Sequence, residues 1–367
     1  MASSFVCETT EELDRVFEGS EPGFAYSRYT SPTNEAFEEQ VTALEGGTGA
    51  LACASGMTAL DMALRTALMD RPKRVLIARA IYGATLKLAH QVMEPFGVDV
   101  ADVDTNDLPA VAAALSERKT GAVVLETISN PLLRVAALDE ISKLCRAANA
   151  AMIVDNTFAT PLLVRPLELG ANLVVHSATK YLAGHGDVLG GIIVSDQEHY
   201  ETLRRLSRVI GAVLGPFESD HALRGTKTFA LRMERQCRNA AQLAAWLREQ
   251  PQVERVFHPG DPAHPDACVV RRLLPDGLYG GMVSFEIRNA GKGEVFAFLD
   301  RLKMIVRATS LGDVHTMVLH PWISSHRDVS PKQKERMGIR VNLVRLSVGI
   351  EDIEDIQADL AQALAGC

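Results

Sequence analysis

Short apolar runs alternate with longer amphipathic segments through the first two thirds of the chain. Runs rich in β-branched residues predict strands at 75–78, 122–125, 152–154, 173–175 and 191–194. These runs lack the period-2 alternation of a strand with one solvated face, and segments of helical periodicity, such as 108–117 and 138–148, lie between them. The pattern predicts an α/β fold whose mostly parallel sheet is covered on both faces.

The character of the chain changes at both ends of this region. Residues 1–34 are polar and rich in turn-forming residues, and they predict an N-terminal arm. Residues 35–230 predict the large domain. After about residue 230 a long helical pattern leads into shorter strands and helices, so 231–367 predicts a smaller α+β C-terminal domain.

Composition and charge exclude several classes of protein. The 367 residues are 47% hydrophobic and 23% charged, which is typical of a globular chain rather than a disordered one. A net charge of −8 without long Lys/Arg runs argues against a nucleic-acid partner. Apolar runs stay below the ~18 residues of a membrane span, so we expect no membrane association. The first residues do not resemble a signal peptide and the six cysteines are scattered, so we expect reduced thiols and a cytoplasmic location.

Polar side chains follow three neighbouring predicted strands. Glu126 follows the first, Asp155-Asn156-Thr157 the second, and the run from His176 to Lys180 the third. Ligands of open α/β sheets bind outside the carboxyl ends of the strands. The sequence therefore predicts two carboxylates and a Ser/Thr/Lys cluster at one rim.

A stretch of small residues, Ser55-Gly56-Met57, precedes an apolar-periodic helix at 59–69. The backbone N–H groups of such a helix start can bind an anion, although an ordinary N-cap by Ser55 explains this stretch equally well on its own. A phosphate cradle, a lysine amine for a Schiff base and a carboxylate for a ring nitrogen together meet the needs of pyridoxal 5′-phosphate (PLP).

The run from Val174 to Asp187 resembles the lysine segment of the cystathionine γ-synthase/γ-lyase (Cys/Met metabolism, transsulfuration) family of PLP-dependent enzymes. Further matches follow in family order at 26–28, 31–33, 55–57, 82–83, 126–131, 155–157, 310–312 and 345–349. The resemblance implies a fold-type-I PLP-dependent transferase-like large domain with a smaller C-terminal domain.

The resemblance also implies roles around the cofactor. Lys180 is expected to form the Schiff base and to move protons on the substrate, and Asp155 to pair with the pyridinium nitrogen. Tyr82 is expected to stack on the cofactor ring and to act as acid and base at the leaving group. Further cofactor contacts are implied for Gly56, Met57, Thr157, Ser177 and Thr179.

Two residues of the arm imply an oligomer. In the family, the positions of Tyr26 and Arg28 reach the phosphate of a neighbouring subunit, so we expect a homo-oligomer that is a dimer at least. The family's usual leading segment does not precede Met1 here, so a tetramer built as a dimer of dimers stays open.

The expected substrate is a small amino acid. Arg345, with Asn130 and Ser310, resembles the family's carboxylate grip, and Arg offers a bidentate fork for that group. Ser325 and Glu126 are further expected substrate contacts, and His326 follows Ser325 in the matching motif. The implied reaction is γ-elimination (a carbon–sulfur lyase) or γ-replacement on homoserine- or homocysteine-derived amino acids, with methionine γ-lyase or O-acylhomoserine sulfhydrylase activity as the alternative.

Two positions depart from specialised members of the family. Ala84 stands where methionine γ-lyases carry Cys, and His315 stands where cystathionine-specific members often carry Glu. We therefore expect the enzyme to discriminate only weakly between sulfur amino acids that differ on the far side of the γ-sulfur.

Other chemistries explain fewer of these residues. Ser177 to Lys180 spells S-x-x-K and 119–121 spells K-T-G, but the β-lactamase order is reversed and S-D-N is absent. The histidines at 315, 320 and 326 lack an H-E-x-x-H pattern, so no metal site is predicted. A non-catalytic PLP-binding scaffold is the alternative from a different class. Such a scaffold would be expected to lack Lys180, Tyr82 or Arg345, and all three are present.

Overall fold

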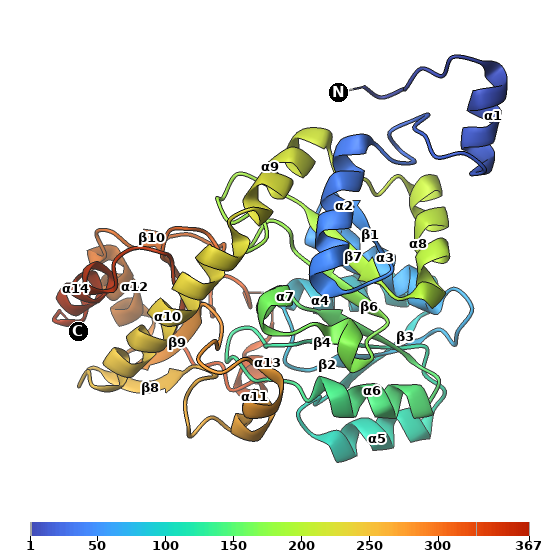
Figure 1. The fold of residues 1–367 in the computed structure, drawn as a ribbon. Helices are drawn as coiled ribbons and strands as arrows, with labels where there is room; N and C mark the ends of the chain where they lie inside the picture. Colours follow the sequence, from blue (N-terminus) through green and yellow to red (C-terminus); the bar gives the residue numbers. More distant parts are fainter. Residues whose placement is uncertain (1, 328, 367) are drawn as a thin grey trace.

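The computed structural model describes residues 2–327 and 329–366. Figure 1 shows a larger and a smaller α/β unit, with the long helix α10 (Phe229–Arg248) running from one to the other. The N-terminal arm projects from the larger unit, on the side away from the C-terminus.

The larger unit is built on a seven-stranded sheet in the order β1-β7-β6-β5-β4-β2-β3. Its strands are β1 (Gly49–Cys53), β2 (Arg74–Ala78), β3 (Asp99–Val103), β4 (Ala122–Glu126), β5 (Ala151–Asp155), β6 (Leu173–His176) and β7 (Gly191–Ser195). Strand β7 is antiparallel to both of its neighbours, and the other pairs are parallel. The predicted mostly parallel sheet is confirmed, with β1 and β3 as additional strands.

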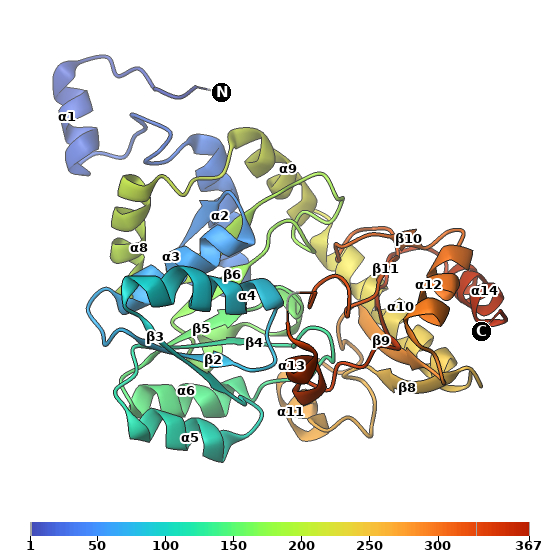
Figure 2. The same cartoon turned by 180° about the vertical axis from the view of Figure 1, so that it is seen from behind.

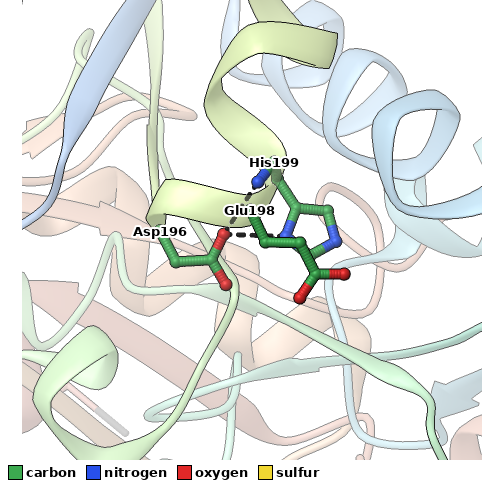
Figure 3. A group of neighbouring side chains, drawn as sticks. All are labelled: Asp196, Glu198 and His199. Atoms are coloured by element: carbon green, nitrogen blue, oxygen red, sulfur yellow. Dashed lines mark hydrogen bonds and ion pairs between the residues drawn. The ribbon is translucent and has the colours of Figure 1, made fainter.

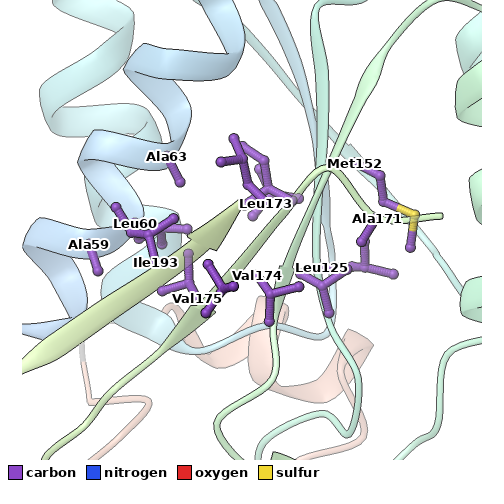
Figure 4. Packing of buried hydrophobic residues seen from close by; sticks show 14 of the residues in the cluster. Ala59, Leu60, Ala63, Leu125, Met152, Ala171, Leu173, Val174, Val175 and Ile193 are labelled. Carbon is purple, nitrogen blue, oxygen red and sulfur yellow. The ribbon is translucent and has the colours of Figure 1, made fainter. Parts of the chain in front are cut away.

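Helices cover both faces of this sheet. Figures 1 and 2 show α3 (Gly56–Leu68) on one side, and α5 (Leu108–Glu117) and α6 (Leu138–Ala147) on the other. In Figure 4, Leu60 of α3 lies beside Ile193 and Val175, all of them buried. The other helical segments of this unit are α2 (Pro32–Glu45), α4 (Gly83–Lys87), η1 (Leu88–Met93), η2 (Glu94–Phe96), α7 (Thr160–Leu163), η3 (Pro166–Leu169), α8 (Gln197–Ile210) and α9 (Pro216–Thr226).

The smaller unit has a five-stranded sheet in the order β10-β11-β12-β9-β8. Its strands are β8 (Val253–Phe257), β9 (Met282–Ile287), β10 (Val306–Arg307), β11 (Met317–Leu319) and β12 (Leu343–Ser347). Its helices are α11 (Ala267–Leu273), α12 (Lys292–Arg301), α13 (Pro331–Arg336) and α14 (Ile353–Leu364). The mixed helices and strands match the predicted α+β character of this region.

Helix α10 contributes to two hydrophobic cores. Met233 and Cys237 pack in the core of the larger unit, whereas Leu243 and Leu247 pack in that of the smaller one. The predicted domain boundary at residue 231 therefore falls within this helix.

The arm contains one helix, α1 (Thr10–Glu18), none of whose residues is buried. An isolated bridge between Ser4 and Tyr26 closes the arm into a loop, and the Arg28 guanidinium donates to the backbone oxygen of Arg208 at the end of α8. Further contacts with α8 come from Tyr29, whose backbone oxygen accepts from Arg204 and whose ring lies beside Arg208.

Within the two described ranges, none of the helices is long and apolar enough to cross a membrane.

Candidate active site

A cavity of about 650 Å³ opens at the carboxyl ends of β4, β5 and β6, and residues of both units line it. The predicted site residues in its wall are Gly56, Met57, Tyr82, Glu126, Asn130, Asp155, Thr157, Ser177, Thr179, Lys180, Ser325 and Arg345. The structure thus brings together residues that lie up to about 290 positions apart in the sequence.

One end of the cavity suits an anion. Helix α3 begins there, with the Ser55 hydroxyl capping the N–H of Thr58 at 3.1 Å. A Cβ at Gly56 would lie 3.0 Å from the Cα of Ser177, so glycine allows the helix start and the Ser177 loop to approach each other. Backbone N–H groups beside a hydroxyl fit a phosphate group. The Thr179 hydroxyl, by contrast, already bonds to the backbone of Gly190, as donor at 3.1 Å and as acceptor at 2.9 Å.

Asp155 ends β5 and is held by Thr157. The Thr157 hydroxyl donates to Asp155 Oδ1 at 2.5 Å, the Thr157 N–H donates to the same oxygen at 3.0 Å, and the hydroxyl accepts the N–H of Ser177 at 2.9 Å. Burial raises the pKa of Asp155, and the bonds from Thr157 oppose that rise. A carboxylate held in this way fits a protonated ring nitrogen.

The amine of Lys180 lies inside the cavity and donates to Ser310 Oγ at 2.9 Å. Burial, and next the positive charge of Arg345, lower the pKa of Lys180 to about 8. A sizeable fraction of the amine is therefore neutral near physiological pH, as attack on an aldehyde and proton transfer both require.

Arg345 is buried in the middle of β12 and points into the cavity wall. Its Nη1 donates to Asn130 Oδ1 at 2.9 Å and its Nη2 donates to the backbone oxygen of Ser310 at 3.3 Å. Its Nε is buried without a hydrogen-bond partner among the described residues. Burial lowers the pKa of Arg345 to about 10, so the guanidinium stays charged and keeps a donor for an incoming carboxylate.

Glu126 connects the two sides of the cavity through backbone hydrogen bonds. Its Oε1 accepts the N–H of Tyr82 and its Oε2 accepts the N–H of Asn130, both at 2.9 Å. Burial, and next the negative charge of Asp155, raise the pKa of Glu126 to about 8. Because both oxygens already serve the backbone, this side chain fixes Tyr82 and Asn130 in place.

Some expected residues lie outside the cavity wall. Ser310 touches it only through its bonds to Lys180 and Arg345. Tyr26 and Arg28 sit on the arm, where the Arg28 guanidinium lies 5.6 Å from the centre of the Tyr26 ring. The structure therefore does not bring these two arm residues to the cavity of their own chain.

His326 and His315 differ in their surroundings. His326 is buried and its Nδ1 lies 3.0 Å from the Ser325 hydroxyl; burial lowers its pKa to about 4. His315 keeps 68% of its side chain exposed and bonds to Asp313 at 3.1 Å, outside the cavity wall.

Several lining residues escaped the sequence analysis: Leu60, Ile128, Phe158, Leu189, Thr309, Leu311, Leu319, Ile323, Ser324 and Arg327. Phe158 follows Thr157 directly, and its ring centre lies 6.0 Å from the guanidinium carbon of Arg345, so its place after the β5 motif could have been a signal. Leu60 lies on α3 and Ile128 lies just after β4, whereas Thr309, Leu311, Leu319, Ile323, Ser324 and Arg327 reach the cavity from the smaller unit, so their place depends on how the two units meet.

The described residues also bring three potential metal ligands together at the start of α8, namely Asp196, Glu198 and His199 (Figure 3). Asp196 caps the helix by accepting the His199 N–H at 3.0 Å and also bonds to the imidazole at 2.7 Å. Glu198 pairs with Arg71 at 2.7 Å. Helix capping and an ion pair thus explain the group.

Comparisons with known proteins agree with this geometry. The family described as Cys/Met metabolism PLP-dependent enzyme matches residues 1–365. An L-methionine gamma-lyase of Fusobacterium nucleatum is 41% identical over 99% of this chain and 91% of its own length. A cystathionine beta-lyase of Coxiella burnetii is 40% identical over 94% and 89% of the two chains. The crystal structure of a cystathionine gamma synthase of Xanthomonas oryzae pv. oryzae, in complex with aminoacrylate and cysteine, superposes with a TM-score of 0.93 at 32% identity, over 99% of this chain and 91% of that one.

Proposed function

Because the chain belongs to the family of Cys/Met metabolism PLP-dependent enzymes, we propose that it breaks or exchanges the bond between the γ-carbon and its substituent in homoserine- and homocysteine-derived amino acids. The observation that carries the proposal is one cavity that holds Lys180, Tyr82 and Arg345 together. When bound, PLP supplies an electron sink for negative charge beside the substrate's α-carbon.

The donor set of the cavity fits PLP, and each of its groups has a task. Gly56, Met57 and Ser177 hold the phosphate at the start of α3. Asp155, oriented by Thr157, holds the ring nitrogen. Lys180 holds the aldehyde carbon. The Thr179 hydroxyl supports the cradle through Gly190 or turns to the phosphate itself.

The substrate is held from the opposite side. Arg345 grips the α-carboxylate with its free Nε, while Asn130 and Ser310 fix the guanidinium from behind. Ser325 lies at the same wall. With the substrate in place, the neutral amine of Lys180 would take the proton from the α-carbon, and it could take one from the β-carbon only after giving the first proton up.

Tyr82 delivers a proton to the leaving γ-substituent. Its side chain is 38% exposed, so the phenol borders the open part of the cavity. Its backbone is tied to Glu126, which fixes where the ring stands. Departure of the γ-substituent leads to 2-oxobutanoate and ammonia with water, or to replacement when a thiol takes its place.

The site is completed by a second copy of the chain. Tyr26 and Arg28 lie on the arm, which projects from the larger unit (Figure 1), and neither residue lines the cavity of its own chain. Val209 and Ile210, where the arm touches α8, are 80% and 51% exposed, and Leu231 is 71% exposed. Apolar side chains of this kind suit burial against another subunit. A dimer that shares its sites in this way is the smallest active assembly we propose.

A substrate panel with product identification tests the function. Cystathionine, methionine, homocysteine, cysteine and O-acylhomoserines with and without cysteine are offered to the purified enzyme. Release of 2-oxobutanoate supports γ-elimination, and cystathionine formed from an O-acylhomoserine supports γ-replacement. Release of pyruvate and homocysteine from cystathionine would show that the enzyme instead cleaves the bond between the β-carbon and sulfur. PLP binding without any keto acid or replacement product would support the scaffold alternative and overturn the proposal.

A further inference from the structure

A buried pair of titratable side chains lies behind the strand ends that form the cavity. Glu45, the last residue of α2, is fully buried, and His176, the last residue of β6, is 1% exposed. His176 Nε2 lies 2.6 Å from Glu45 Oε1, a separation at the short end for a charge-assisted bond. Neither residue lines the cavity, and the roles assigned above do not use them.

The pair is part of a network that crosses three strand ends. Asn156 Nδ2 donates to Glu45 Oε1 at 2.9 Å, and Asn156 Oδ1 accepts the hydroxyl of Thr127 at 2.7 Å. Glu45 Oε1 thereby joins the ends of β5 and β6 directly, and Asn156 extends the connection to the end of β4.

Each of these strand ends serves the cavity and the network with two adjacent residues. The pairs, cavity residue first, are Glu126 with Thr127, Asp155 with Asn156, and Ser177 with His176. Successive side chains of an extended chain point to opposite sides, so a shift of the network side moves the cavity side with it.

The network also places the titratable side chain of His176 close enough to Asp155 to influence its pKa. Burial raises the pKa of Asp155, and the two hydrogen bonds from Thr157, followed by the electrostatic influence of His176, oppose that rise. Glu45 Oε2 is buried without a hydrogen-bond partner among the described residues, so Oε1 alone makes the contacts with His176 and Asn156. On the cavity side, Glu126 lies close enough to Asp155 for the negative charge of Asp155 to raise the pKa of Glu126.

We infer that Glu45 is a positioning residue for the cofactor site: through its bonds to His176 and Asn156 it holds the three strand ends together and keeps Asp155 in place and negatively charged. The inference rests on the proposed cofactor site. A ring nitrogen stays protonated only beside a carboxylate, so Glu45 sets both the affinity for PLP and the electronic state of its ring.

The variant Glu45→Gln removes the charge of Glu45 but keeps an acceptor, because the amide oxygen of glutamine can still accept hydrogen bonds from Asn156 and from the imidazole of His176. PLP affinity is measured by titrating apoenzyme, together with the visible absorbance of the bound cofactor, circular dichroism and the melting temperature. We expect about tenfold weaker PLP binding and a shifted absorbance band. The control is Glu38→Gln on the same helix, a buried carboxylate that pairs with Arg204 at 3.0 Å; it should bind PLP as the wild type does.

The double variant Glu45→Gln/His176→Asn leaves neither charge buried alone and carries the test if the single variant does not fold. It should lose about as much PLP affinity as Glu45→Gln alone, because the two residues act as one unit. A folded Glu45→Gln or double variant with wild-type PLP affinity and absorbance would overturn the inference. If the wild type itself fails to bind PLP, the proposed cofactor site falls instead.

Discussion

The lowered pKa of Lys180 makes a quantitative prediction about how apoenzyme captures PLP. Only the neutral amine attacks an aldehyde, so the capture rate follows the neutral fraction of Lys180. Burial, and next the charge of Arg345, bring the pKa of this amine to about 8. Because the neutral form gains as pH rises, the rate should climb below pH 8 and level off above it.

The size of the effect separates this amine from an ordinary lysine. With a pKa of about 8, the neutral fraction is about 0.1 at pH 7 and about 0.9 at pH 9, so the rate rises about tenfold and then reaches a plateau. An ordinary lysine with a pKa of ~10.4 would give a rise of about a hundredfold over the same interval, with no plateau. The two curves differ in shape as well as in height.

Stopped-flow mixing of apoenzyme with excess PLP measures the rate from the growth of visible absorbance. Lys180→Ala supplies the baseline for non-covalent binding and for the titration of PLP itself. Arg345→Met removes the second cause of the lowered pKa and should move the midpoint to higher pH. A wild-type rate that still rises tenfold per pH unit at pH 9.5 would refute the reasoning about burial, and an unmoved midpoint in Arg345→Met would refute the part given to that charge.

Further predictions concern the same cavity. Mixed Arg28→Ala and Lys180→Ala subunits, each inactive alone, should regain part of the activity once exchange is demonstrated; no recovery would argue against shared sites. Lys180→Met should raise the free energy of unfolding of the apoenzyme by about 3 kcal/mol at pH 7. Protonating the buried amine of Lys180 destabilises the folded wild type below pH 8, and this destabilisation fades toward pH 10.5; chemical unfolding at pH 7 and at pH 10.5 checks this. Glu126→Ala should lower kcat more than tenfold by loosening Tyr82, with PLP affinity within threefold of wild type, and equal losses in both would contradict the clamp. Arg327→Met should lower kcat/KM about tenfold for cystathionine but not for methionine, and an equal loss for both would exclude Arg327 from specificity.

The strands that could be predicted are those with uninterrupted β-branched runs. Strand β1, Gly49–Cys53, is fully buried but contains only small residues and one leucine, so no run marks it. Strand β3, Asp99–Val103, lies at the edge of the sheet and carries aspartates at positions 99 and 102. Pairing with β7 and β2 makes these segments strands, and pairing is not visible along the chain.

The inner cavity could be predicted for a related reason. Asp155 and Lys180 follow buried strands directly, so the topology of a parallel sheet places them at one edge whatever the loops do. Leu189, Ile323 and Arg327 reach the cavity only through the docking of loops and of the smaller unit. Glu45 was equally hidden, since its contact with His176 spans 131 positions and depends on where α2 ends.

This division between inner and outer residues bears on the choice of substrate. In the proposed binding mode, the inner groups contact the cofactor and the substrate's α-carboxylate. Both of these are the same for every amino acid of this class, so the inner groups would not distinguish one γ-substituent from another. Discrimination falls to the rim formed by 323–327 and Leu189. Among the described lining residues, Arg327 is the one charge at this rim, and both cavity carboxylates, Glu126 and Asp155, lie at the inner strand ends. A distal carboxylate therefore meets an attractive charge, whereas the described residues of the rim offer no opposite charge to a distal ammonium.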